Sequence, residues 1–209
     1  MLFLKIGRCE KWPSLSRRGN LTLTAKTYYL HFLAQSLCVR AAMTVDERSF
    51  RRTLGCFATG VTVVTTLIPN TTVPLGVTVS SFSSLSLSPP LILFSLGKDL
   101  STIDSYCDFG YFAVNVLAET QRDISIRFSS RVDDRWRGIK YKTWESGVPI
   151  LDECLANLEC RLSAVHDGGD HLIFVGEVVR LRHEEGGAPL IYFRGAYMEY
   201  GPPPPVAAG

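Results

Sequence analysis

Residues 76–96 read GVTVSSFSSLSLSPPLILFSL and decide the fold. At the start of this stretch, polar Thr78 and Ser80 alternate with apolar Val77 and Val79. An alternation with a period of two predicts a strand with one face buried and one face open. The stretch therefore begins with a half-buried strand whose open face carries hydroxyl groups.

The same stretch ends in the core. The alternation breaks at residues 81–84, where we expect a loop or bulge, and Pro89-Pro90 ends the polar segment. The continuous apolar run at residues 91–94 predicts a strand buried on both faces. Hydroxyl groups and free backbone N–H groups beside such a strand can bind a phosphate or a sugar without Lys or Arg. A serine-rich loop that binds nothing is the alternative on residue types alone.

Size and charge limit the class of protein. The chain has 209 residues, enough for one good core, and no window approaches the roughly 18 apolar residues of a membrane helix. Residues 1–42 carry seven Lys or Arg and one acidic residue, so their net charge is +6 and the remainder carries −4. The body of the chain therefore has no basic footprint for nucleic acid, and we expect neither a nucleic-acid nor a membrane partner.

The first 42 residues differ in composition from the rest. They are basic, rich in hydroxyl groups and poor in acids, which is typical of an organellar transit peptide. Alternatively, translation begins at Met43 and these residues are an upstream extension. We favour the second interpretation because a capping box, Thr44 with Glu47, follows at once. We expect one domain over residues 43–201 and a proline-rich tail over residues 202–209.

The cysteine and histidine spacings indicate neither a metal site nor a disulfide framework. No two cysteines form a C-x-x-C pair, and His166 and His171 lie five residues apart across a turn, which fixes no ligand geometry. Reduced thiols in a cytoplasmic protein are the expectation. The six cysteines are Cys9, Cys38, Cys56, Cys107, Cys154 and Cys160.

Strand patterns dominate the remaining chain. We expect a first helix that Gly60 ends, a short helix capped by Ser101, a helix over 120–129 and a charged surface excursion or lid over 131–142. Further strands are expected at 61–66, 111–117, 155–166, 171–181 and 190–200. Hairpin spacing and the lack of βαβ alternation predict a mainly β protein with short helices, closed or nearly closed as an antiparallel barrel.

Residues 46–200 resemble the flavin reductase family, which has the FMN-binding split-barrel fold. The resemblance is carried by FATGVTVVT at 57–65, by 76–82 with SLSPPL at 86–91, by FAVNVL at 112–117, and by GDH at 169–171 with FVGEV at 174–178. The chain looks most similar to the reductase components of two-component flavin monooxygenases that hydroxylate aromatic or steroid rings. Their chemistry is hydride transfer from NADH or NADPH to FAD or FMN, which needs positioned cofactors rather than a protein nucleophile.

The resemblance implies a set of flavin contacts. Ser101 and Thr102 would reach the phosphate at a helix N-terminus, and Arg127 would add a charged contact. The segment Gly97-Lys98-Asp99-Leu100 departs from the Ser/Thr-rich version usual in the family. The implied flavin site comprises Leu75, Gly76, Val77, Thr78, Val79, Ser80, Ser81, Ser95, Leu96, Gly97, Ser101, Thr102, Arg127 and Phe128.

The resemblance also implies a nicotinamide site and partners. His171 would meet NADH or NADPH, and Tyr192, Phe193, Arg194 and Gly195 would complete that site. Such proteins are homodimers that pass reduced flavin to a separate monooxygenase. Two alternatives are a flavin-binding module without activity, and an oxidase of the pyridoxamine-phosphate type, for which Lys98, Arg127 and Arg194 are few and scattered.

Overall fold

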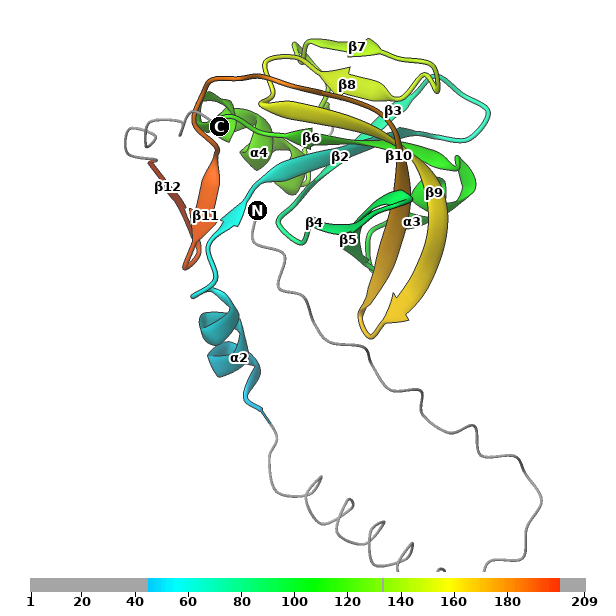
Figure 1. Cartoon of the computed structure of the whole chain (residues 1–209). Helices are drawn as coiled ribbons and strands as arrows, with labels where there is room; N and C mark the ends of the chain where they lie inside the picture. The colour runs from blue at the N-terminus through cyan, green and yellow to red at the C-terminus, as the bar shows by residue number, and fades with distance from the viewer. Residues whose placement is uncertain (1–44, 133, 200–209) are drawn as a thin grey trace, which may run out of the picture. The chain divides into compact units, whose positions relative to one another are not determined.

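A computed structural model of the chain describes residues 45–132 and 134–199 (Figure 1). It divides into two units, residues 1–49 and residues 50–209. The expectations for the N-terminal extension, the Thr44 cap and the proline-rich tail fall on residues outside the described ones. Of the first unit, the described part shows Asp46 Oδ2 accepting a hydrogen bond from the Ser49 N–H at 2.8 Å. The hydrogen bonds of Ser49 hold the pKa of Asp46 below its usual value.

Strands are the main regular elements of the described chain. The helices are α2 (Glu47–Leu54), which crosses the boundary between the two units, α3 (Ile103–Asp108) and α4 (Arg122–Ser129), with the 3-10 turn η1 (Glu119–Gln121) before α4. The strands are β1 (Thr59–Gly60), β2 (Thr62–Leu67), β3 (Pro74–Val79), β4 (Ser83–Leu87), β5 (Pro90–Gly97), β6 (Tyr111–Val116), β7 (Tyr141–Thr143), β8 (Pro149–Leu151), β9 (Ala156–Gly168), β10 (His171–His183), β11 (Ile191–Phe193) and β12 (Ala196–Met198).

One seven-stranded sheet organises the second unit. Its strand order is β3-β2-β6-β9-β10-β5-β4, and every pairing is antiparallel. Strands β3 and β5 approach each other although four strands separate them in the sheet order, so the sheet curls on itself. Because β3 and β5 form no ladder, the barrel stays split along this line. The predicted mainly β, antiparallel split barrel is confirmed.

Aromatic rings fill the barrel. The Phe94 and Phe174 rings stack with centroids 5.1 Å apart, and Phe112 meets Phe94 edge-on at 5.0 Å. A Cβ on Gly176 would lie only 2.3 Å from the Phe112 ring, so this position must lack a side chain for Phe112 to enter the core. The apolar strand patterns of the sequence thus converge on one aromatic cluster.

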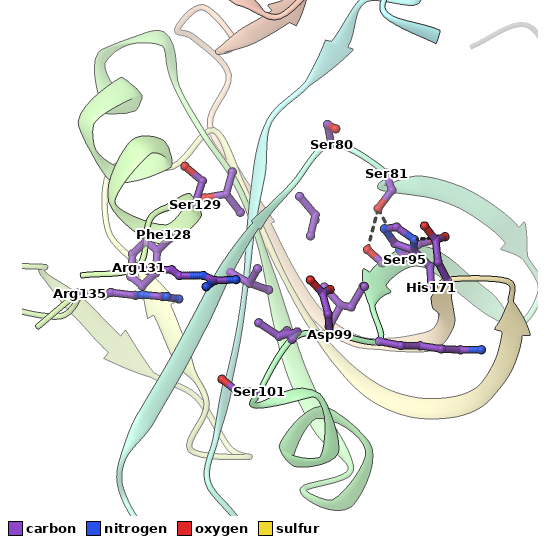
Figure 2. Close-up of a pocket in the computed structure, with 18 of the residues that line it drawn as sticks. Ser80, Ser81, Ser95, Asp99, Ser101, Phe128, Ser129, Arg131, Arg135 and His171 are labelled. Atoms are coloured by element: carbon purple, nitrogen blue, oxygen red, sulfur yellow. Dashed lines mark hydrogen bonds and ion pairs between the residues drawn. The ribbon is translucent and has the colours of Figure 1, made fainter. Parts of the chain in front are cut away.

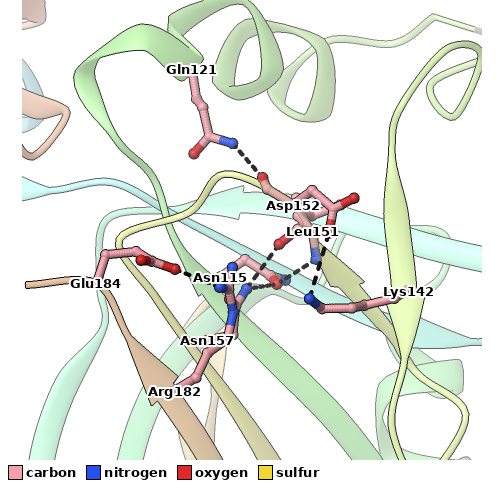
Figure 3. Close-up of polar contacts among 8 residues, drawn as sticks. All are labelled: Asn115, Gln121, Lys142, Leu151, Asp152, Asn157, Arg182 and Glu184. Carbon is pink, nitrogen blue, oxygen red and sulfur yellow. Dashed lines mark hydrogen bonds and ion pairs between the residues drawn. The ribbon is translucent and has the colours of Figure 1, made fainter. Parts of the chain in front are cut away.

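A buried polar network ties β6, β8, β9 and β10 together (Figure 3). The Asn157 Nδ2 donates to Asn115 Oδ1 at 2.7 Å and to the Leu151 carbonyl at 3.1 Å. Arg182 Nε donates to Asn157 Oδ1 at 2.7 Å, and Arg182 also pairs with Glu184. The strand expected over residues 155–166 is confirmed as part of β9, but the buried polar contacts were not expected, because the sequence analysis did not predict the hairpin β7–β8.

The structure corrects three predicted segments. Residues 83–87, expected within a loop or bulge and a polar segment, form the edge strand β4 of a hairpin with β5. Strand β5 alternates between buried and half-buried positions instead of being buried on both faces. The single strand expected over residues 190–200 is the tight hairpin β11–β12, because Arg194 and Gly195 both adopt positive φ.

Two helix boundaries also differ. Helix α2 ends at Leu54, and Gly60 lies in β1 rather than at a helix end. Helix α3 begins after Thr102, without a side-chain cap from Ser101. The helix expected over residues 120–129 is confirmed as η1 followed by α4.

Candidate functional site

A cavity opens where the barrel is split, between β3, the end of β5 and the segment after α4 (Figure 2). We call it the β3–β5 cavity, and its volume is about 1210 Å³. Its lining residues are Val77, Thr78, Val79, Ser80, Ser81, Ser95, Leu96, Gly97, Lys98, Asp99, Leu100, Ser101, Phe128, Ser129, Arg131, Val132, Arg135, Asp170 and His171. Strand β3 is an edge strand, so one row of its backbone N–H and C=O groups has no partner strand.

Packing of α4 against β3 builds one wall. The Phe128 ring is buried, and a Cβ on Gly76 would lie 2.6 Å from it. The Thr78 hydroxyl donates to the Ser125 carbonyl of α4 at 2.8 Å. Gly76 therefore supports the wall from outside the cavity, and the Thr78 hydroxyl holds the helix in place.

A second hydroxyl joins the two sides of the split. Ser81 Oγ donates to the Ser95 carbonyl at 3.1 Å and accepts from the Ser95 N–H at 2.9 Å. This reciprocal pair joins the loop after β3 to β5. The side-chain hydroxyls of Ser80, Ser95 and Ser101 line the cavity and have no hydrogen bond within residues 45–132 and 134–199, so they are the ones open to a ligand.

The loop after β5 is held by the turn between β9 and β10. Lys98 Nζ forms an ion pair with Asp167 at 2.5 Å, and the Lys98 N–H donates to the Asp170 carbonyl at 2.9 Å. The lysine hydrogen bond and the Gly169 N–H lower the pKa of Asp167. The ammonium group of Lys98 is thus committed to a carboxylate although its residue lines the cavity.

His171 stands at the same end of the cavity. It is the register partner of Gly97 in the antiparallel β5–β10 pair. Its Nδ1 lies 2.7 Å from Asp170 Oδ1, and the hydrogen bond and charge of His171 lower the pKa of Asp170. The strand register and this hydrogen bond together fix where the imidazole ring lies.

Two arginines that sequence reasoning missed reach into the cavity from the side opposite His171 (Figure 2). Neither Arg131 nor Arg135 donates a hydrogen bond or forms an ion pair within the described residues. The charged segment over 131–142 was interpreted only as a surface excursion or lid. A signal was available: arginines directly after a helix that bears a predicted contact, Phe128.

Several predicted contacts lie away from the cavity of this chain. Leu75 and Gly76 belong to β3 but do not line it, and Thr102 precedes α3 without lining it. Arg127 Nη1 donates to the Arg137 carbonyl at 2.6 Å instead. The remaining predicted residues, Tyr192, Phe193, Arg194 and Gly195, form the β11–β12 hairpin and its turn. The other residues predicted to contact flavin, together with His171, all line the cavity.

The cavity suits ligand positioning more than covalent chemistry. It is lined by hydroxyls, apolar β3 side chains, one histidine and charged groups, and no cysteine is among them. Across the described residues, no three His, Cys, Asp or Glu side chains gather as metal ligands. The described helices are all too short or too polar to cross a membrane.

Comparisons with known proteins identify the family of the chain. A family model described as flavin reductase like domain matches residues 54–201. The reductase subunit HsaB of a flavin-dependent monooxygenase from Rhodococcus jostii is 42% identical over 168 residues, which are 80% of this chain and 85% of that protein. The FMN reductase (NADH) SmoA of Agrobacterium fabrum is 43% identical over 155 residues, 74% of this chain and 87% of that protein.

Solved structures give the same result. The NADH:FAD oxidoreductase SgcE6 of Streptomyces globisporus, in complex with NAD and FAD fragments, superimposes with a TM-score of 0.71 at 34% identity. The match covers 80% of this chain and 100% of that chain. The matched family model, the close relatives and the split barrel with its lined cavity lead to one conclusion: the chain belongs to the flavin reductase family.

Proposed function

We propose that the protein is an NADH-dependent flavin reductase that supplies reduced FAD or FMN to a separate monooxygenase. The observation that carries this proposal is the β3–β5 cavity. Its volume of about 1210 Å³ exceeds the roughly 300–1,000 Å³ of a typical single-ligand site, so a flavin and a nicotinamide can share it. Relatives named as a monooxygenase reductase subunit and as an NADH-dependent FMN reductase support the same function.

The residues fit a flavin. A flat ring system needs an apolar wall and edge hydrogen bonds, and Val77, Val79 and the unpaired edge of β3 offer both. Ser80, Ser95 and Ser101 offer hydroxyls to a polyol chain or a phosphate. When bound, the flavin accepts a hydride from NADH and a proton from solvent, giving NAD⁺ and reduced flavin.

The protein's own part is to hold two ligands in reacting geometry. His171 lines the cavity with Asp170 holding its Nδ1, so it can orient a nicotinamide nucleotide. Gly97, its register partner, has no side chain, and the Asp99 carboxylate lies 2.6 Å from where a Cβ on Gly97 would be. No residue of the chain needs to form a covalent bond.

NADH consumption with and without added flavin tests the activity. We expect turnover only when FAD, FMN or riboflavin is present, and many equivalents of free flavin reduced per protein, as a supplier must release its product. His171→Ala should raise the KM for NADH more than that for flavin. His166→Ala is the matched control, an exposed histidine on β9 outside the cavity. Flavin binding without NADH oxidation would instead favour a non-catalytic flavin-binding module.

We further propose that the protein is a homodimer, as the family resemblance implies. The hairpin β11–β12 carries the residues implied for the nicotinamide site but does not reach the cavity of its own chain. A second copy is one way in which such residues could meet a cavity. Light scattering of the purified chain tests the dimer, and a monomer at micromolar concentration would contradict it.

A further inference from the structure

We propose that Arg131 and Arg135 hold the phosphate of the flavin, at the end of the β3–β5 cavity away from His171. This inference rests on the proposed function and adds which residues recognise the phosphate and how the flavin is oriented. Composition and the family resemblance had assigned the phosphate to neutral donors, Ser101 and Thr102, with help from Arg127. The structure supports a different assignment.

Of the cations in and near the cavity, only some are free to bind a ligand. Among cavity-lining residues, Lys98 is bound by Asp167, and Arg127 outside the cavity is bound by the Arg137 carbonyl. Arg131 and Arg135 line the cavity and form neither a hydrogen bond nor an ion pair within the described residues. A guanidinium group presents paired N–H donors that match phosphate oxygens. These two are therefore the cations left to recognise an anionic ligand.

Positive and negative charges lie at different parts of the cavity. Figure 2 shows both arginine side chains entering from one side, while His171 and Ser81 lie on the other. The carboxylates that line the cavity, Asp99 and Asp170, belong to the loop after β5 and to the turn before β10. A phosphate is attracted to the arginine side and repelled from these carboxylates.

This placement of charge sets the orientation of the flavin. With the phosphate at Arg131 and Arg135, the ring lies toward the opposite side of the cavity, where Ser81 and His171 lie, and the ribityl chain spans the space between. The reacting ring then faces the histidine proposed to orient NADH. A flavin bound the other way would place its phosphate beside Asp170.

The helix that was expected to bind the phosphate is a weaker choice. Helix α3 has only six residues, and Thr102 at its start does not line the cavity. Ser101 does line it, but its single hydroxyl carries no charge. Ser101 is thus left to contact the polyol chain.

The test compares FMN with riboflavin, which differ only by the phosphate. Equilibrium binding is measured by flavin fluorescence without nicotinamide nucleotide, so phosphates of NADH cannot contribute. We expect the wild-type protein to bind FMN more tightly than riboflavin, and this preference to shrink as salt is raised. In Arg131→Gln/Arg135→Gln, FMN affinity should fall about tenfold or more while riboflavin affinity changes less than about twofold.

Two single variants serve as comparisons. Arg137→Gln removes the same charge from an exposed side chain of the same segment outside the cavity, so the FMN preference should persist. Arg127→Gln tests the rival assignment. Should Arg127→Gln alone abolish the preference, or should the double variant keep it, the inference is overturned.

The phosphate assignment can still be tested if the double variant does not fold. Arg131 is exposed, so Arg131→Gln alone is tolerated by the fold and should lower the FMN preference at least about threefold. An unchanged preference in that single variant also overturns the inference. An enzyme that reduces FMN and riboflavin with NADH while every variant keeps the wild-type preference retains the proposed function and loses only the phosphate assignment.

Discussion

The imidazole Nδ1 of His171 lies 2.7 Å from the carboxylate Oδ1 of Asp170, and both residues line the β3–β5 cavity. Because Nδ1 is engaged, Nε2 is the nitrogen left for a ligand, and it lies 3.9 Å from the point that a Cβ on Gly97 would occupy. Two neighbouring residues of one turn thus set both the position of the ring and the nitrogen that it offers. Asp170 is a positioning residue in this arrangement.

Asp170→Ala should therefore weaken the binding of NADH more than the binding of flavin. Loss of one exposed hydrogen bond predicts a rise of about three- to tenfold in the KM for NADH, with kcat and FMN affinity nearly unchanged. Asp170→Asn keeps an acceptor oxygen for Nδ1–H and should restore most of the loss. Steady-state kinetics decide this, and equal KM values for wild type and Asp170→Ala would show that the ring needs no orienting partner.

A matched pair of glycine variants tests how the cavity wall is built. In Gly76→Ala the added methyl group would lie 2.6 Å from the buried Phe128 ring, which packs on Trp136 and cannot move freely. We expect the free energy of unfolding to fall by about 1–3 kcal/mol. In Gly97→Ala the nearest atom, also at 2.6 Å, is the end of the Asp99 side chain, which can rotate away.

The Gly97→Ala variant should thus lose less than about 1 kcal/mol of stability, although its methyl group enters the cavity. Urea unfolding of both variants measures the difference. Equal losses would mean that Phe128 adjusts as easily as a solvent-exposed carboxylate does.

A substitution in the polar network around Asn157, which does not line the cavity, should lower the free energy of unfolding more than the glycine variants do. Asn157→Leu keeps the size of the side chain but leaves the Leu151 carbonyl and Arg182 Nε without their partner. An orphaned buried group costs about 1–3 kcal/mol, and the partly buried Arg182 Nε should cost less, so the free energy of unfolding should fall by roughly 2–4 kcal/mol. Ser163→Ala, at an exposed position of β9, is the control and should change it by less than about 0.5 kcal/mol. A tolerated Asn157→Leu would indicate that the network orders the hairpin β7–β8 without stabilising the sheet.

Most of the fold could be predicted from the alternation of apolar and polar residues and from the turn residues. The half-buried strand at Val77 and Val79, the hairpin at Gly169 and the antiparallel pairing of β2 with β3 are visible in local patterns. Strand β4 was missed because its serines mask the alternation of Leu85 and Leu87, which stay exposed at a sheet edge. The β11–β12 hairpin was missed because Arg194, a residue that rarely takes positive φ, occupies its turn.

Only the part of the site that comes from neighbouring segments of the chain could be predicted. The cavity-lining residues of β3 and β5 lie close together in the sequence, so the pattern of one stretch identified them. Arg131 and Arg135 enter from a segment with no regular period, and nothing local says that Lys98 is already paired with Asp167. Contacts between distant segments decide which basic side chain is left to bind a ligand, and a local sequence pattern does not show such contacts.

Two buried thiols should make the free energy of unfolding fall as the pH becomes alkaline. Burial raises the pKa of Cys154 to about 11 and of Cys160 to about 12, from the ordinary value of 9.0. Above pH 9 the unfolded chain loses these protons while the folded chain keeps them, so each thiol lowers stability as pH rises toward its folded pKa.

Between pH 8 and pH 10 the Cys160 thiol should lower the free energy of unfolding by about 1 kcal/mol, since one pKa unit corresponds to about 1.4 kcal/mol. Cys160→Ala should start less stable at pH 8 because it leaves a small cavity, yet its urea midpoint should fall less steeply toward pH 10 than that of the wild type. Cys56→Ala, at an exposed position, should keep the wild-type slope. Alkylation at pH 8, mapped by peptide mass spectrometry, should mark Cys56 and spare Cys160. Rapid labelling of Cys160 would show that the barrel opens locally at that strand, and a wild-type slope in Cys160→Ala would mean that its thiolate is not the group that burial penalises.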